Sequence, residues 1–299
     1  TWSAQLSPFF LLCVVGVGIA YGLAVGKYRD RVPGSGPVER KKKLFFYSGL
    51  AVVYLAFGSP IDLLGHMIFS AHMVSMSLAY LIAPPLLLLG LPEWMLRPAV
   101  QRLKSSPIGF LIHPIVALFL FNGLFSFYHW PSVHDYVMVH YLLHTIYYLV
   151  LFLTALLMWW FMITPVPDMR QLGDLKQLAY VFANGALLTP ACALIIFAGV
   201  PVYDTYTDAE AWVQAMGFCA PGMDPALLIE RFGGPEYFAI LPPLNDQQLG
   251  GVIMKLTQEA MYGTILCYGL RRWYRRENRE DDLDEGAELN LESGGLNRA

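Results

Sequence analysis

The chain has 299 residues, of which 56% are hydrophobic and only 14% are charged, and its formal net charge is −3. Soluble globular proteins are typically about 45–50% apolar and about 25% charged, so this composition excludes an ordinary soluble domain. The small net charge indicates no partner, because an acidic C-terminal segment offsets basic segments elsewhere in the chain.

Six long segments carry no Asp, Glu, Lys or Arg, and a helix needs about 20 such residues to cross a bilayer. In chain order they are 8–26, 44–61, 63–92, 105–134, 136–167 and 177–203. A seventh apolar run, 249–270, contains Lys255 and Glu259. Backbone groups in lipid must find their partners within the segment, so these runs must be helical. The sequence predicts an all-α, polytopic integral membrane protein with seven transmembrane helices.

The basic residues predict the orientation of these helices. If the N-terminus is outside, four segments face the cytoplasm: 27–43, 93–104, 168–176 and everything after Leu270. Together they hold 18 of the 20 Lys and Arg. Lys and Arg concentrate in cytoplasmic loops, so we expect an outer N-terminus and a cytoplasmic C-terminus. No basic region precedes the first helix, so we expect that helix to be retained and not cleaved as a signal peptide.

The remaining segments suggest how the chain is divided. Residues 1–276 form the expected seven-helix transmembrane domain, with a long outer loop at 200–248 whose aromatic residues suggest an ordered cap. Residues 277–299 contain eight acids and no aromatic side chain, which predicts a disordered cytoplasmic tail. Pro84 and Pro85 predict a kink in the third helix.

The four cysteines do not form a disulfide framework. Cys13, Cys192 and Cys267 fall within predicted spans, which leaves Cys219 alone in the outer loop. We expect the first three to act as small hydrophobic residues.

Most of the histidines converge on the outer face. His66 and His72 lie in the outer part of the third helix, and only His113 lies near the cytoplasmic side, where packing is its expected role. His140 and His144 are four residues apart, which places both rings on one helix face, a common arrangement for two metal ligands. Met76 follows His72 at the same spacing. Imidazole beside thioether suits Cu(I), and the only acids nearby, Asp62 and Asp135, are too few for a Mg, Ca or di-iron site. The candidate metal ligands are His66, His72, Met73, Met76, His129, His134, His140 and His144.

The alternative is that these residues have only structural roles. Histidine is tolerated at membrane interfaces, and helical methionine usually packs in the core. Lys255 and Glu259 are four residues apart, and we expect them to form an ion pair that holds the seventh helix in the bundle. The alternative is that Glu259 supports a histidine that binds the metal.

Several motifs resemble the CtaG family of cytochrome c oxidase assembly factors in its Bacillus-type form. They are GSPIDLLGHM at 58–67, SAHM at 70–73, APPLLLLGLP at 83–92, DQQLGG at 246–251, Trp159-Trp160, and the His140/His144 pair. The resemblance covers the second to the seventh helix.

This resemblance implies a multi-pass protein of the bacterial plasma membrane that helps to mature the copper-containing active site of a haem–copper oxidase. It implies no enzymatic turnover, Cu(I) as the bound metal, and the oxidase subunits and the lipid bilayer as partners, without nucleic acid. The histidine of the family's third helix corresponds to His72. Many members have a second histidine four residues later, where this chain has Met76. A thioether at that position keeps a donor that Cu(I) accepts. Oligomeric state is left open.

Two other functions remain as alternatives. A membrane haem protein could use His72 and His144 as axial ligands, although the chain has no c-type Cys-x-x-Cys-His motif. A retinal-type receptor or pump is suggested by seven helices and Lys255, but that lysine lies near the outer end and the third helix contains no acid to act as counter-ion.

Overall fold

The structure, a computed structural model, describes the backbone of residues 7–217 and 225–296, and the side chains up to residue 278 except Pro225. The described residues form helices and contain no strand, which confirms the all-helical class. Cys219 lies outside the described residues, so its predicted isolation in the outer loop is untested.

The helices fall into two groups by length. The longer ones are α2 (Pro8–Val25), α3 (Arg40–Phe57), α5 (Phe69–Ser77), α7 (Glu93–Lys104), α8 (Pro114–Tyr128), α10 (Tyr141–Ile163), α11 (Asp174–Ile196) and α14 (Pro243–Leu296). The shorter ones are α4 (Pro60–Gly65), α6 (Ala83–Gly90), α9 (Pro131–Met138), α12 (Ala209–Met216) and α13 (Pro225–Phe232), together with the single turns η1 (Arg29–Arg31), η2 (Leu78–Ile82), η3 (Gly109–Leu111), η4 (Pro167–Met169), η5 (Asp204–Tyr206) and η6 (Pro235–Phe238).

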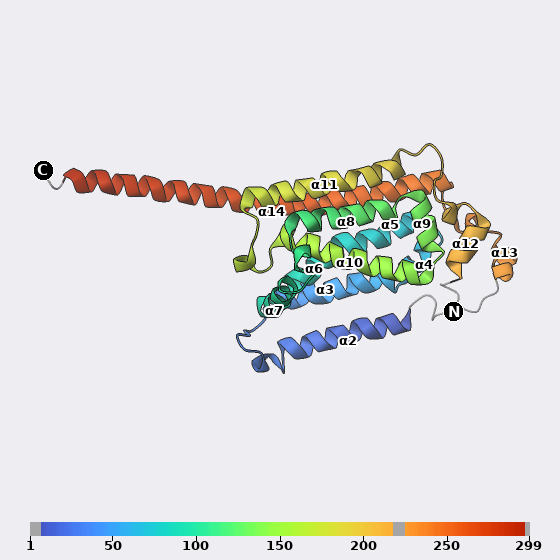
Figure 1. Ribbon diagram of the computed structural model, residues 1–299, viewed down its shortest axis with the longest axis horizontal. Helices are drawn as coiled ribbons and strands as arrows, with labels where there is room; N and C mark the ends of the chain where they lie inside the picture. The colour runs from blue at the N-terminus through green and yellow to red at the C-terminus, as the bar shows by residue number, and fades with distance from the viewer. Residues whose placement is uncertain (1–6, 218–224, 297–299) are drawn as a thin grey trace.

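Five helical stretches are long and apolar enough to cross a membrane. They are Pro8–Val25, Arg40–Gly65, Phe69–Gly90, Tyr141–Ile163 and Asp174–Ile196. α8 is apolar but has 15 residues, and the first part of α14, which carries Lys255 and Glu259, lies along α11 in the bundle (Figure 1). The structure therefore supports a multi-helix membrane protein with five candidate spans.

The stretch from α5 to α6 contains the predicted interruption at the prolines. Pro84 and Pro85 have no N–H, so they cannot donate to the carbonyl groups of Tyr80 and Leu81 in the preceding turn. The backbone widens into a π turn at η2, and the indole Nε1 of Trp159 donates to the Tyr80 carbonyl at 2.9 Å. A side chain from α10 thus supplies one of the donors that the prolines remove.

The two ends of the bundle differ in chemistry (Figure 1). The cap end carries α4, α9, α12 and α13, and a small apolar cluster around Trp212, with Leu63 and Met67 packed against it, joins the cap to the bundle. The basic end carries α7 and the start of α11. There Asp174 accepts hydrogen bonds from Arg170, Arg272 and Arg276, which ties α11 to α14.

Beyond the bundle α14 continues as a helix to Leu296, although composition favours a disordered tail from residue 277 (Figure 1). Extending an existing helix needs no new nucleus, and residues 277–296 include five Glu and four Leu, which favour helix. Residues 297–299 lie outside the described part, and the domain boundary at 276 stays a prediction.

Candidate functional site

Five histidines from five helical segments meet at the cap end. His66 caps the C-terminus of α4, and His72 lies on α5. His129 follows α8, His134 lies on α9, and His144 lies on the first turn of α10. The ring of His72 lies 5.2 Å from that of His134 and 6.2 Å from that of His129, and we call these three the histidine trio. His66 and His144 lie 5.5 Å apart and form the histidine pair.

Two imidazoles are held in one tautomer by backbone carbonyl groups. His129 Nδ1 lies 2.8 Å from the carbonyl oxygen of Phe125, and His66 Nδ1 lies 3.0 Å from that of Asp62. A carbonyl only accepts, so the proton of each ring is on Nδ1 and the lone pair is on Nε2. Ligating histidines usually donate their other ring N–H in this way.

A chain of hydroxyl groups assigns the same tautomer to His72. Tyr128 Oη lies 3.5 Å from Met138 Sδ, and a thioether only accepts, so Tyr128 donates to it. Tyr148 must then donate to Tyr128 across 3.1 Å. With that proton engaged, Tyr148 Oη, 3.4 Å from His72 Nδ1, can only accept from the ring. The lone pair of His72 is therefore on Nε2.

The Nε2 atoms of His72, His129, His134 and His144 are buried and have no hydrogen-bond partner among the described residues. Buried polar groups are normally satisfied, so an unpartnered one needs an explanation. Unpartnered imidazole nitrogens from α5, α8, α9 and α10 at one end of the bundle are what an electron-pair acceptor, such as a metal ion, would require.

The spacing of the rings fits shared ligation. With a metal–nitrogen bond of about 2.0 Å and a ring radius of about 1.2 Å, two imidazoles on one metal have centroids about 5–6.4 Å apart, depending on the bond angle. The distances from the His72 ring to the other two rings of the trio, and the distance within the pair, lie in this range. Among the described residues no group of three or more His, Cys, Asp or Glu could hold a metal ion as the side chains stand.

The carboxylate of Asp135 lies beside the histidines, 3.5 Å from His134 Nδ1. This carboxylate accepts from the N–H of Asp204 and from both the N–H and the hydroxyl of Thr205, at 3.0, 3.1 and 2.7 Å. Burial alone would raise the pKa of Asp135, but His134 and the Thr205 hydrogen bonds outweigh it and hold that pKa below its ordinary value. Burial lowers the pKa of His134 despite Asp135 nearby, so this ring is neutral at pH 7 and keeps a lone pair.

The segment that Asp135 anchors closes over the trio. Tyr203 stacks on Phe69, with 4.6 Å between ring centroids, and lies 4.6 Å from the ring of His134. Its hydroxyl donates to the carbonyl of His129 at 2.9 Å, and Tyr206 donates to the carbonyl of Gly65 at 2.7 Å. We call residues 203–206 the lid. The long loop between α11 and α14 thus supplies part of the wall around the histidines.

The model of one protein family, described as cytochrome c oxidase caa3 assembly factor, matches residues 19–276, which is most of the chain. The chain belongs to this family. Neither a comparison with curated proteins nor one with solved structures yields a match.

The DQQ motif at 246–248 has a clear structural role. Asp246 accepts from the N–H of Ser70 at 3.1 Å and from its hydroxyl, at the start of α5. Gln247 accepts from the N–H of Val202 at 2.8 Å and donates to the carbonyl of Ile195, and Gln248 donates to Ala198. These contacts hold the start of α14 against α5, against the end of α11 and beside the lid.

Three of the predicted ligands do not join the five histidines. His140 is exposed, its ring lies on Tyr136 at 4.2 Å, and its Nδ1 lies 2.6 Å from the Tyr136 carbonyl oxygen. The four-residue spacing to His144 does not align the rings, because His140 has extended backbone and α10 begins at Tyr141. Met73 packs toward Gly250 of α14, and Met76 is buried in the core one turn beyond His72.

Other residues that the sequence singled out lie away from the histidines. His113 precedes α8 at its far end and is exposed instead of packed. The predicted ion pair between Lys255 and Glu259 is present at 2.7 Å, and Lys255 also bonds Thr189 of α11. The Glu259 side chain is 60% exposed, so it does not support a histidine. Of the three described cysteines, Cys192 is buried, while Cys13 and Cys267 are exposed on the helix surface.

Met138, Tyr128 and Tyr148 are not among the residues that the sequence predicts for the site. His134 and Met138 are four residues apart on α9, and both are buried, so the spacing rule that links His72 to Met76 applies to them as well. The sequence prediction misses this because it divides the chain at Asp135, between two predicted spans, and so does not place His134 and Met138 on one helix. Nothing in the sequence pattern identifies the two tyrosines, which meet only in the folded bundle.

Proposed function

We propose that the protein is a copper-handling assembly factor that binds Cu(I) at the cap-end histidines and delivers it to a haem–copper cytochrome c oxidase. Family membership supports the oxidase part of this function. Copper is its cargo, and no catalysed reaction is part of the function.

The observation that carries the copper part is the set of unpartnered Nε2 atoms of His72, His129, His134 and His144. The imidazoles outnumber the nearby carboxylates, Asp62 and Asp135, which suits a low-charge ion. The thioether of Met138 beside Tyr128 adds a donor that Cu(I) accepts. An outer-end site also lets an ion pass laterally to a membrane partner without crossing hydrocarbon as a bare charge.

The same proposal includes seven spans with the cap end outside. α2 starts at the cap end and α14 leaves the bundle at the basic end, as an odd number of crossings requires (Figure 1). α8 and the first part of α14 lie among the candidate spans and supply the sixth and seventh crossings. Cytoplasmic placement of the basic end follows from its Lys and Arg.

The direct test measures Cu(I) bound to the purified protein. His72→Ala and His134→Ala each remove one lone pair from the trio, so we expect the Cu(I) affinity to fall by at least about 10-fold. Changing a residue that only supports a metal ligand already costs about 10–100-fold in affinity, and these variants remove a ligand itself. His113→Ala is the matched control, because it removes an exposed histidine at the far end of α8. Equal Cu(I) binding by all three variants and the wild type would refute the site.

The cellular test links the site to the oxidase. Cells without the protein, or with His72→Ala, should keep the oxidase polypeptides in the membrane but lose active-site copper and activity at limiting external copper. Full oxidase activity in the deletion strain would overturn the assembly role.

The visible spectrum of the purified protein addresses the haem alternative, since bis-histidine haem would show strong absorption bands and Cu(I) would show none.

A further inference from the structure

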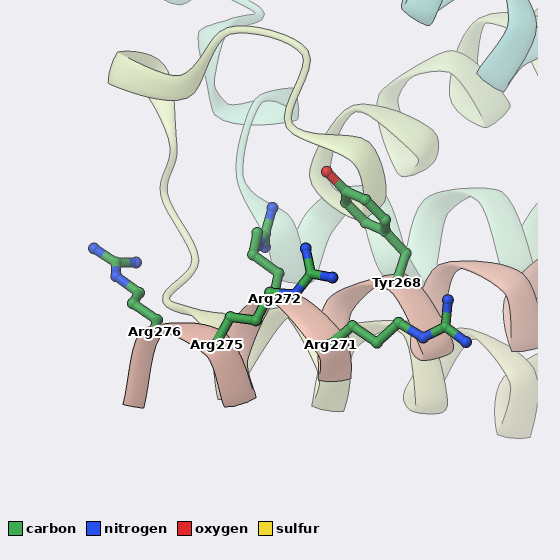
Figure 2. Close-up of a pocket in the computed structure, with 5 residues that line it drawn as sticks. All are labelled: Tyr268, Arg271, Arg272, Arg275 and Arg276. Atoms are coloured by element: carbon green, nitrogen blue, oxygen red, sulfur yellow. The ribbon is translucent and has the colours of Figure 1, made fainter. Parts of the chain in front are cut away.

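The basic end contains a hollow that the histidine site does not use. Its volume is about 540 Å³, and it is lined by Tyr268 and by Arg271, Arg272, Arg275 and Arg276 (Figure 2). All five side chains come from successive turns of α14, where the apolar run of that helix ends at Leu270.

The four arginines fall into two stripes with different partners. Arg272 and Arg276 are four residues apart, and they bond Asp174 at 3.1 and 3.0 Å, so they are held against α11. Arg271 and Arg275 repeat this spacing on the adjoining stripe and are exposed, and no carboxylate among the described side chains lies within ion-pair distance of either. Asp174 bonds two of these arginines and also bonds Arg170, so the described side chains leave the hollow with net positive charge.

The surroundings of the hollow match the boundary between lipid and water. Tyr268 is 66% exposed and Tyr274 is 61% exposed, and Leu270 beside them is 48% exposed. Exposed aromatic rings next to apolar surface are typical of the headgroup level of a bilayer. Guanidinium groups bind phosphate oxygens in a bidentate manner and remain charged at every physiological pH.

α14 continues straight beyond Arg276, which carries the residues after it away from the bundle (Figure 1). The charge of Arg271 and Arg275 is therefore available to a ligand from outside the chain.

We infer that this hollow binds the phosphate headgroup of an anionic phospholipid, with Arg271 and Arg275 on the phosphate and Tyr268 against the upper acyl chain. A lipid fits better than a free anion, because the arginines border surface that faces the hydrocarbon. The site does not depend on copper, so it stands or fails separately from the proposed function.

The test uses the full chain in mild detergent and native mass spectrometry with phosphatidylglycerol or phosphatidylcholine of identical acyl chains. We expect selective retention of phosphatidylglycerol, reduced by about 5-fold for each arginine removed and about 25-fold in Arg271→Gln/Arg275→Gln. Neither residue bonds Asp174, so the thermal stability of the double variant should be that of the wild type.

The matched control is Arg102→Gln/Lys104→Gln, which removes two exposed positive charges from α7 at the same end. It should retain phosphatidylglycerol like the wild type. Equal retention of the two lipids, or an equal loss in the control, would overturn the site. Displacement of the lipid by inorganic phosphate at the same concentration would show a free-anion site and would overturn the lipid assignment.

Discussion

Proton positions decide what the cap-end histidines can do. Each imidazole has one proton to place, and the acceptors around His66, His72 and His129 draw it to Nδ1. Two of these acceptors are backbone carbonyl groups, which cannot change. The third is the hydroxyl of Tyr148, whose direction depends on Tyr128 and finally on the sulfur of Met138. His72 is therefore the ring whose lone pair depends on other side chains.

Tyr148→Phe should weaken Cu(I) binding without unfolding the protein. Removal of the hydroxyl frees the proton of His72 to occupy either nitrogen, and loss of a group that orients a ligand typically costs about 10–100-fold in metal affinity. Imidazole ¹⁵N shifts of the copper-free protein would report the tautomer directly, and a Cu(I) competition titration would report the affinity.

The adjacent residue supplies the control for this variant. Tyr147 donates to the Leu124 carbonyl at 2.9 Å and takes no part in the hydroxyl chain. Tyr147→Phe therefore also loses one hydrogen bond but should keep both the His72 tautomer and the affinity. If the two phenylalanine variants bind Cu(I) equally, the hydroxyl chain does not position His72.

Among the elements, α9 and the lid act as one unit. Asp135 joins them through three hydrogen bonds, and the aromatic rings of the lid then cover Phe69 and His134. The lid has no other carboxylate anchor among the described residues, so its closure depends on this one side chain.

Asp135→Ala should open the lid. A hydrogen bond to a charged group contributes about 1.5–3 kcal/mol, so loss of all three should speed amide hydrogen exchange of residues 203–207 by at least about 10-fold. Asp208→Ala is the control, because it removes two N-cap bonds of α12 and none to α9. Unchanged exchange in Asp135→Ala would mean that aromatic packing alone holds the lid.

Element boundaries explain how far the sequence predicts this site. The predicted helix ends place most histidines at one end of the bundle, as the structure does. An apolar run in lipid must form a helix, so its length determines which end of the bundle each residue reaches. The prediction for His140 depended on a helix that begins one residue later than its spacing required. The lid could not be predicted, since the bonds of Asp135 to Thr205 join residues 70 positions apart and have no local pattern.

For the whole molecule, the two ends of the bundle differ in the side chains that they gather. The cap end gathers neutral imidazoles and aromatic rings, and the basic end gathers arginines around Asp174. A bundle with this asymmetry should insert in one orientation only, because translocating the arginines of the basic end would cost about 2.5–3.5 kcal/mol for each one moved to the helix centre.

Reporter fusions test this orientation and the odd number of crossings together. A reporter fused after Arg276 should be active only in the cytoplasm, and one inserted at Gly233, in the turn between α13 and η6, should be active only outside. A third reporter at Ser106, which follows α7 at the basic end, should behave like the C-terminal fusion. The reason is the distribution of Lys and Arg, which the positive-inside rule assigns to the cytoplasm. If the C-terminal reporter were active outside while the Ser106 reporter stayed cytoplasmic, α14 would not cross the membrane as proposed. If all three reporters were inverted, the histidines would face the cytoplasm, and copper delivery from the outer surface would lose its geometric basis.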